Sequence, residues 1–241
     1  MGWKAHATYD PSMPDRALDD ILADDRSAGI RALRRHHRAT LQHHERVSQV
    51  KFVLEAATGQ VVMPVEPGFA AEDINSLLLW LPAESDWDMQ AVVNPRPIGR
   101  PEASEAVDRW KAYHGSTSLS IWVRGEIEGV KTGTAVFLIE DVQVPNPFDR
   151  EEYGLIRRAN ADRAALAAAC KQHAATLVTD PLCVGADPYG IDVRARFGIV
   201  RLEFPPGIEA ATPARCQEEI DRLLGGAKIA SSGKPNAGEN R

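Results

Sequence analysis

Four histidines lie in two adjacent pairs in the N-terminal part of the chain, at positions 36, 37, 43 and 44. Imidazole is the commonest metal ligand among side chains and also binds haem iron. Apolar residues recur at helical spacing over 27–47, so we expect a helix on which His37 and His44 share a face. At about 1.5 Å per residue these two lie about 10 Å apart, too far to share one metal ion. The histidines are therefore predicted to be interface or core-edge residues, or to supply a single haem ligand, His37 or His44.

Other motifs of nucleophilic or phosphate chemistry do not occur in the sequence. It contains no GxSxG, and Gly233-Lys234 is followed by Pro235 instead of Ser or Thr, which excludes a P-loop there. The three cysteines have no CxxC spacing and are expected to be reduced core thiols: Cys170, Cys183 and Cys216. Spacing identifies no acid–base pair, so the sequence leaves open whether the protein is an enzyme.

Composition narrows the classes of function. Of the 241 residues, 44% are hydrophobic and 26% are charged, as in soluble globular proteins. The formal net charge of −6 argues against nucleic acid as a partner. No apolar run approaches the roughly 20 residues that span a bilayer, and the N-terminal segment lacks the basic and apolar regions of a signal peptide. We therefore expect a cytoplasmic protein with no membrane partner.

The hydrophobic period changes from helical to strand-like after the histidines. The chain begins with a polar arm over residues 1–25 and the helix at 27–47. We then expect a hairpin at 49–65, a strand at 76–81 and a short helix near 84–93 that leads into a loop. A helix at 101–114 and two long strands, at 117–128 and 132–144, complete this part of the chain. Meandering strands of this length do not stay flat, and closure into a small barrel removes their exposed edges. Residues 26–145 are therefore predicted to form an antiparallel β-barrel domain.

A second domain is predicted after Pro145-Asn146-Pro147, because prolines on both sides of an asparagine end a strand and stiffen a link. It is expected over residues 148–226, as a helix at 149–177, strands at 182–186, 190–196 and 199–204, and a last helix at 212–225. The polar tail at 227–241 is expected to be disordered. The fold class is α+β, a barrel followed by an α-β-β-β-α domain.

Charged and apolar residues alternate along the hairpin at 190–204. Alternation places the charged side chains on one face, which we expect to be an open solvated face or a docking surface for a partner: Asp192, Arg194, Arg196, Arg201 and Glu203. The opposite face is predicted to be packed: Ile191, Val193, Ala195, Val200, Leu202 and Phe204.

Two stretches of the second domain carry a family resemblance. "LIRRANADRAALAAAC" (155–170) resembles a helix with an Asn-x-Asp-His signature, and "CVGADPYGIDVRARFGIVRLEFP" (183–205) is similar to the hairpin that follows it, with an Asp-x-x-Gly-x-Asp-x-Arg run. Both belong to the haem-utilisation branch of the pyridoxamine 5'-phosphate oxidase-like, FMN-binding split-barrel proteins. The resemblance covers about 70 residues, and over the barrel only the order of elements matches. It implies a split barrel and a homodimer.

The resemblance also implies a cofactor, either FMN or haem, and redox chemistry or haem utilisation. A flavin phosphate needs cations and hydrogen-bond donors at strand ends, and the candidates are Lys51, Ser85, Arg96, Arg124 and Lys131. Trp122 is the candidate to lie beside the flavin ring. Arg163 replaces the signature histidine, which favours an alternative, a cofactor-free binding module that kept the fold and lost the site. A flavin-dependent oxidase of small molecules is a further hypothesis.

Overall fold

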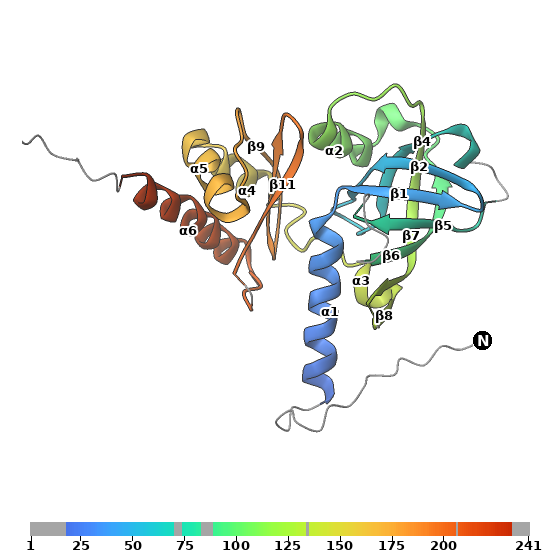
Figure 1. Cartoon of the computed structure of the whole chain (residues 1–241), viewed down its shortest axis with the longest axis horizontal. Coiled ribbons are helices and arrows are strands. Elements are labelled where there is room, and N and C mark those ends of the chain that lie inside the picture. The colour runs from blue at the N-terminus through green and yellow to red at the C-terminus, as the bar shows by residue number, and fades with distance from the viewer. Residues whose placement is uncertain (1–17, 70–73, 83–88, 134, 206, 233–241) are drawn as a thin grey trace, which may run out of the picture. The chain divides into compact units, whose positions relative to one another are not determined.

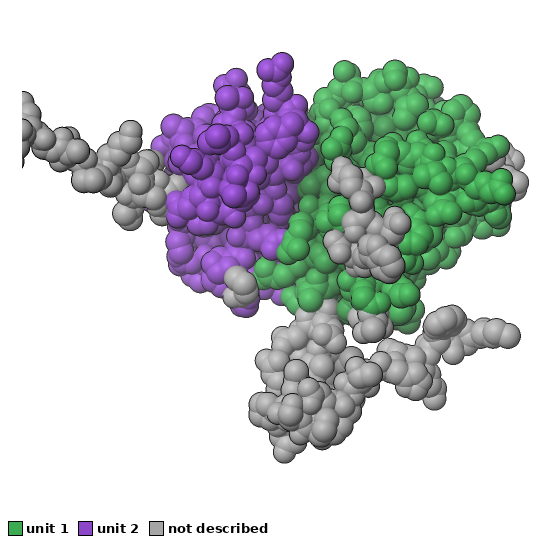
Figure 2. Space-filling view, in the orientation of Figure 1, with its two compact units in different colours: residues 1–145 green, residues 146–241 purple. Residues whose placement is uncertain are grey.

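The computed structural model of the chain describes residues 18–69, 74–82, 89–133, 135–205 and 207–232. The chain divides into two compact units, residues 1–145 and 146–241, which Figure 2 distinguishes by colour. Both units combine helices with an antiparallel sheet, so the predicted α+β class is confirmed.

The first unit is built on one strongly curled antiparallel sheet, which forms a half-barrel (Figure 1). Its strands are β1 (Arg38–His43), β2 (Arg46–Lys51), β3 (Val53–Leu54), β4 (Val61–Val65), β5 (Leu77–Leu81), β6 (Met89–Pro97), β7 (Ile121–Thr132) and β8 (Ala135–Leu138). They lie in the order β2-β1-β5-β6-β7-β4-β3, and β8 pairs with β7. The curled sheet is compatible with the predicted split barrel.

Alternate residues of these strands face a shared core, as the two-residue period of a strand requires. Leu77, Leu79 and Leu81 of β5 are fully buried, and so are Ala91 and Val93 of the paired strand β6. Burial of each leucine side chain contributes roughly 1.5–3 kcal/mol. The inner face of the sheet therefore stabilises the unit.

Within the described residues of this unit, the helices are the 18-residue α1 (Leu18–Arg35) and the shorter η1 (Pro67–Phe69), η2 (Pro101–Ala103), α2 (Glu105–His114) and α3 (Ile139–Val142). The helix α2 packs beside β3 and β4. It is held there by Trp110, whose Nε1 donates a hydrogen bond of 2.8 Å to the carbonyl of Lys51. This contact brings the C-terminal turn of α2 to the end of β2.

The predicted helix over 27–47 is wrong in its second half. The helix α1 ends at Arg35, and β1 and β2 form a hairpin with His44 in its turn, at φ 53°. The strand β1 pairs with both β2 and β5, which buries Ala39 and Leu41 on one face. Pairing on both sides satisfies the backbone hydrogen bonds of β1 and buries these two side chains. Together these contributions outweigh the helical preference that the spacing of the apolar residues indicated.

Two further segments of the first unit differ from the prediction. In the part of 84–93 that the structure describes, the expected helix is absent, and the strand β6 begins at Met89 between β5 and β7. The expected strand at 132–144 ends at Leu138, and the chain continues as α3, which packs against α1. In both places the local preferences for helix and for strand are weak, so tertiary pairing or packing determines which one forms.

The second unit packs three helices on one face of a three-stranded antiparallel sheet (Figure 1). The helices are α4 (Glu152–Ala159), α5 (Arg163–Ala174) and α6 (Pro213–Ser232), and the strands, in the order β11-β10-β9, are β9 (Leu182–Asp187), β10 (Gly190–Ala195) and β11 (Gly198–Glu203). All six apolar residues predicted for the packed face of the hairpin are buried. The helix α6 continues to Ser232, past Gly225 where we expected it to end.

The single helix predicted over 149–177 is two helices, separated at Asn160. The Asn160 side chain forms two hydrogen bonds with the backbone of Cys183 in β9, each 2.9 Å long. Asp162 then caps α5, because its Oδ1 accepts a hydrogen bond of 2.9 Å from the Ala165 N–H. Asn160 and Asp162 of the Asn-x-Asp-His resemblance therefore have structural roles: Asn160 docks β9 and Asp162 starts α5.

The charged face of the hairpin is buried in part: Asp192 and Arg201 have buried side chains, Arg194 and Glu203 are half-buried, and Arg196 is exposed. The guanidinium of Arg201 lies 2.6 Å from an Asp187 carboxylate oxygen and 3.1 Å from one of Asp192. The three side chains are only 5%, 8% and 6% exposed. We call these three residues the ion cluster. Burial alone would lower the pKa of Arg201, but the two carboxylates outweigh it and the pKa is raised.

The same segment fixes a tight turn between β9 and β10. Asp187 accepts a hydrogen bond of 2.8 Å from the Tyr189 N–H through Oδ1. A Cβ atom at Gly190 would lie 2.3 Å from the carbonyl oxygen of Leu202, so only glycine fits there without a shift of the backbone. The Asp-x-x-Gly-x-Asp run is thus explained by the turn and the ion cluster.

Candidate functional site

Arg96 and Arg124, two of the residues proposed for a phosphate clamp, lie opposite each other on β6 and β7. The Arg124 guanidinium is 2.6 Å from the Glu55 carboxylate, which is largely buried. This carboxylate offsets one of the two positive charges. The pair of arginines therefore presents a weaker field to a phosphate dianion than the sequence suggests.

The other clamp candidates do not join this pair. Lys51 lies at the end of β2, opposite Arg38 in the β1–β2 register. Lys131 follows Arg124 by seven residues along β7, which is about 23 Å at about 3.3 Å per residue. Ser85 lies outside the described residues. The structure therefore does not gather the predicted clamp into one site.

Trp122, the candidate to lie beside a flavin ring, is a packed residue of β7. It is 6% exposed, and its ring meets the Trp110 ring edge-on at 5.2 Å between centroids. A buried ring in an edge-to-face pair contributes to packing. The arrangement offers no open face of Trp122 for a flavin.

A cluster of aromatic and imidazole rings forms between the start of β1, the end of β2 and the helix α2. We call it the aromatic–histidine cluster, and its members are His37, Phe52, Trp110, Tyr113 and His114. The His37 ring lies 5.2 Å from that of Tyr113 and 6.4 Å from that of His114, between centroids. Phe52 and Tyr113 are buried, and His37 and His114 are half-buried as residues, although both ring nitrogens of His37 are buried. Of the two weak haem-ligand candidates, only His37 belongs to this cluster.

His114 is held in one protonation state. Burial lowers its pKa to about 4, with smaller contributions of the same sign from His37, Lys51 and Arg38. The Nε2 atom lies 3.0 Å from the Phe52 carbonyl oxygen, to which a neutral ring donates its N–H. The remaining nitrogen, Nδ1, then carries the lone pair. A neutral imidazole with one nitrogen bonded to a backbone carbonyl is the arrangement in which histidine binds metals.

Positive charge surrounds these rings. Arg38 and Lys51 are exposed cross-strand neighbours at the edge of the cluster. Arg109 lies 5.2 Å from the centre of the Tyr113 ring and donates a hydrogen bond of 3.0 Å to its hydroxyl. The half-buried His114 imidazole and the exposed cations beside it suit a ligand that carries acidic groups.

Sequence reasoning missed the α2 half of this cluster. It predicted the helix at 101–114, and the structure has α2 there, but it assigned no site role to Trp110, Tyr113 or His114. Their signal is the spacing of three and four residues, which places them on one side of a helix. Their proximity to His37 depends on where α2 docks, which the sequence does not give.

Within the described residues, no group of three or more His, Cys, Asp or Glu side chains is placed to hold a metal ion. His44 lies at the exposed hairpin turn, away from the cluster. All three cysteines are buried and unbridged, as predicted. Burial raises the pKa of Cys170 to about 11 and that of Cys216 to about 12, so these thiols stay protonated at neutral pH.

Comparison with known proteins supports the fold. No family model and no curated protein sequence matches the chain. The crystal structure of the protein Atu2129 from Agrobacterium tumefaciens strain C58, of unknown function, is similar at a TM-score of 0.60 and 17% identity, over 90% of this chain and 100% of that chain. A heme binding protein from Mycobacterium smegmatis aligns at 21% identity over 86% of this chain and 98% of that chain, but at a TM-score of 0.34. The first likeness shows the fold alone, and the second is too low to carry an argument.

No helix within the described residues combines the length and the hydrophobicity that crossing a bilayer requires.

Proposed function

We propose that the protein binds haem at the aromatic–histidine cluster and takes part in haem handling. The observation that carries this proposal is the neutral His114 imidazole, whose Nε2 is bonded to the Phe52 carbonyl. Its Nδ1 would ligate the iron, and the neighbouring His37 ring would support the His114 ring from the buried side. The resemblance of the second domain to haem-utilisation proteins points to the same ligand.

The residues around the histidines fit haem in kind. Arg38 and Lys51 are exposed and would pair with the propionates, whereas Trp110 and Tyr113 are buried and would support the His114 ring from inside the unit. Bound haem would supply redox or oxygen chemistry, and the chain would bind and orient it. Whether a reaction is catalysed stays part of the hypothesis.

FMN is the weaker cofactor hypothesis. Glu55 already pairs with Arg124, Lys131 is remote along β7, and Trp122 is buried. The same Arg124–Glu55 pair favours a second candidate function, a binding module without a cofactor, because it replaces an external anion with a carboxylate of the chain. The homodimer also stays a proposal, favoured by the exposed Val47 on the edge strand β2.

Titration of the full chain with haem tests the proposal. We expect a saturable Soret band from the wild type, and a loss of at least about tenfold in affinity for His114→Gln and for His37→Ala. His44→Ala is the matched control, since His44 is an exposed histidine at the tip of the same β1–β2 hairpin. Thermal unfolding of each variant shows whether a loss reflects the site or the fold.

Two outcomes contradict haem binding at this cluster. If His44→Ala weakens binding as much as His37→Ala does, haem binds nonspecifically to exposed histidines. If the wild type gives no saturable Soret band, the cofactor-free module is the better function.

A further inference from the structure

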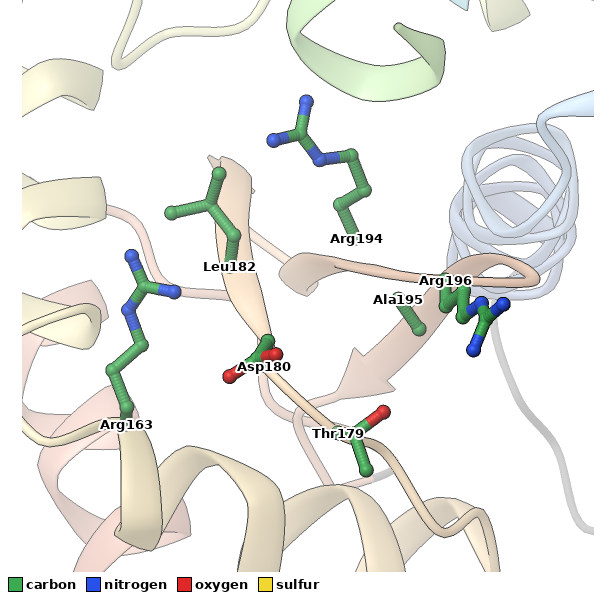
Figure 3. A pocket seen from close by; sticks show the side chains of 7 residues that line it. All are labelled: Arg163, Thr179, Asp180, Leu182, Arg194, Ala195 and Arg196. Carbon is green, nitrogen blue, oxygen red and sulfur yellow. The ribbon is translucent and has the colours of Figure 1, made fainter.

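The second unit contains a pocket of about 490 Å³ lined by three arginines (Figure 3). We propose that this pocket binds a small organic anion with at least two negative charges, carried by carboxylate or phosphate groups. We call it the arginine pocket, and its lining residues are Arg163, Thr179, Asp180, Leu182, Arg194, Ala195 and Arg196. The proposal is independent of haem binding in the first unit.

Charge is the first argument for an anionic ligand. The lining contains three guanidinium groups and one carboxylate, that of Asp180, so it carries an excess of positive charge. The planar guanidinium matches carboxylate and phosphate oxygens with two parallel hydrogen bonds. Figure 3 shows the arginines on different sides of the pocket, and this spread suits a ligand whose charges are separated. The volume lies within the range of small-molecule sites, about 300–1,000 Å³.

The second argument is that a helix and a strand hold two of the three arginines, whereas Arg196 lies in the turn between β10 and β11. Arg163 is the first residue of α5, directly after the Asp162 cap, and its Nη1 donates a hydrogen bond of 3.0 Å to the Pro181 carbonyl. Arg194 lies in β10 between the buried residues Val193 and Ala195. Side chains fixed on such elements lose little freedom on binding, which favours affinity.

Asp180 supplies the third argument. Its φ of 53° lies in the left-handed region, and the residue precedes Pro181, where extended backbone is preferred. Backbone strain of this kind gathers at ligand sites. In the pocket the Asp180 carboxylate would accept a hydrogen bond from a hydroxyl or amino group of the ligand, and it would repel a bare anion. Asp180 therefore sets selectivity where the arginines set affinity.

Two of the pocket arginines stand at positions of the family signature. Arg163 occupies the position at which the family signature has histidine, and Arg194 closes the Asp-x-x-Gly-x-Asp-x-Arg run. Asn160, Asp162 and the rest of the run are explained by docking, capping and the ion cluster. Arg163, at the histidine position of the signature, and Arg194, the last residue of the run, both line the arginine pocket.

Calorimetric titration of the full chain at low ionic strength tests the proposal, with inorganic pyrophosphate and succinate as probes. We expect saturable binding of at least one of them, and the preferred probe separates a phosphate site from a carboxylate site. Arg196→Gln should weaken that binding about tenfold, since it removes charge-assisted hydrogen bonds. Arg196 is exposed and has no hydrogen bond or ion pair among the residues that the structure describes, so the fold tolerates this change.

Two further variants make the test sharp. Asp180→Asn should strengthen pyrophosphate or succinate binding about threefold, because it removes a like charge. Arg157→Gln removes an exposed arginine of α4 that does not line the pocket, and it should leave the affinity unchanged. The opposite signs at Asp180 and Arg196 are not expected from loss of structure.

The proposal is overturned if neither probe binds saturably, or if Arg157→Gln weakens binding as much as Arg196→Gln does. The latter result would mean attraction to the net charge of the surface. Haem titration of the same variants is expected to be unchanged, so failure here is distinguishable from failure of the haem proposal.

Discussion

The ion cluster of the second unit and the aromatic–histidine cluster of the first both take ionisable groups out of water, but they do so differently. In the ion cluster, Arg201 is matched by Asp187 and Asp192, and Asp187 also caps the turn at Tyr189. In the aromatic–histidine cluster, His114 has given up its charge and bonds a backbone carbonyl through one nitrogen only. The first arrangement is complete within the chain, and the second leaves a lone pair for a ligand.

The contrast shows that residues of the family resemblance can have structural roles. Residues that a motif search would call a signature, such as Asp192 in the hairpin, are buried in ion pairs. His114, which lies outside any motif, is neutral at pH 7 and bonds the Phe52 carbonyl through Nε2. A signature can therefore report the fold, while the chemistry lies elsewhere.

The largest test of this contrast is Arg201→Met. The change leaves two carboxylates buried together without a cation, and we expect a loss of about 3–5 kcal/mol in the free energy of unfolding of the second unit. Urea unfolding followed by circular dichroism measures it. Arg196→Met, at an exposed position two residues before the start of β11, is the control and should change stability by less than about 0.5 kcal/mol.

A triple variant, Arg201→Met with Asp187→Asn and Asp192→Asn, sharpens the result. Removing all three charges should restore much of the stability, because the cost comes from unpaired buried charge. If Arg201→Met costs no more than Arg196→Met, the ion cluster does not stabilise the unit, and the contrast with the aromatic–histidine cluster fails.

The next effect is the pH dependence contributed by His114. Its pKa is about 4 in the folded chain and about 6.5 when unfolded, so the unfolded state binds more protons between these values. Stability from this residue is therefore full above about pH 6.5 and is lost as the pH falls toward about 4. Between pH 7.5 and pH 4.5 we expect a loss of about 2–3 kcal/mol.

Urea unfolding of the wild type and of His114→Gln at the two pH values measures this contribution. The variant should show a smaller loss of stability on acidification, because glutamine does not titrate. An equal pH dependence in both proteins would mean that His114 is not held neutral, and the setting assigned to it as a haem ligand would be lost.

Local sequence signals predicted the second unit better than the first. Alternation identified all six packed residues of the hairpin. The three strands lie within one residue of their predicted bounds, because turn residues separate segments rich in β-branched residues. Neighbouring strands there are joined by tight turns, so local pattern and pairing agree. The burial of Asp192 and Arg201 was not predicted, because a pattern of alternating charges does not say whether opposite charges pair inside the unit or face water.

The first unit shows why the candidate site was harder to predict. The segment from His37 to Val47 has helical spacing, but β5, more than thirty residues later, pairs with it and makes it a strand. His37 and His114 come together only through that pairing and the docking of α2. Contacts between distant segments are set by tertiary structure, which propensity in a local window does not encode.

The smallest effects distinguish two residues of the Asn-x-Asp stretch. Asn160→Ala removes two hydrogen bonds and leaves the N–H and C=O of the buried Cys183 without them, so we expect a loss of about 2 kcal/mol. Asp162→Ala removes only the cap of α5, which costs about 1 kcal/mol. Thermal unfolding of both variants measures the difference. We expect the larger loss at Asn160 because its side chain holds β9 against the break between α4 and α5. A larger loss at Asp162 would mean that the stretch stabilises the unit mainly by starting α5. In that case the position of Arg163 at the arginine pocket, one residue after the cap, would depend on the same contact.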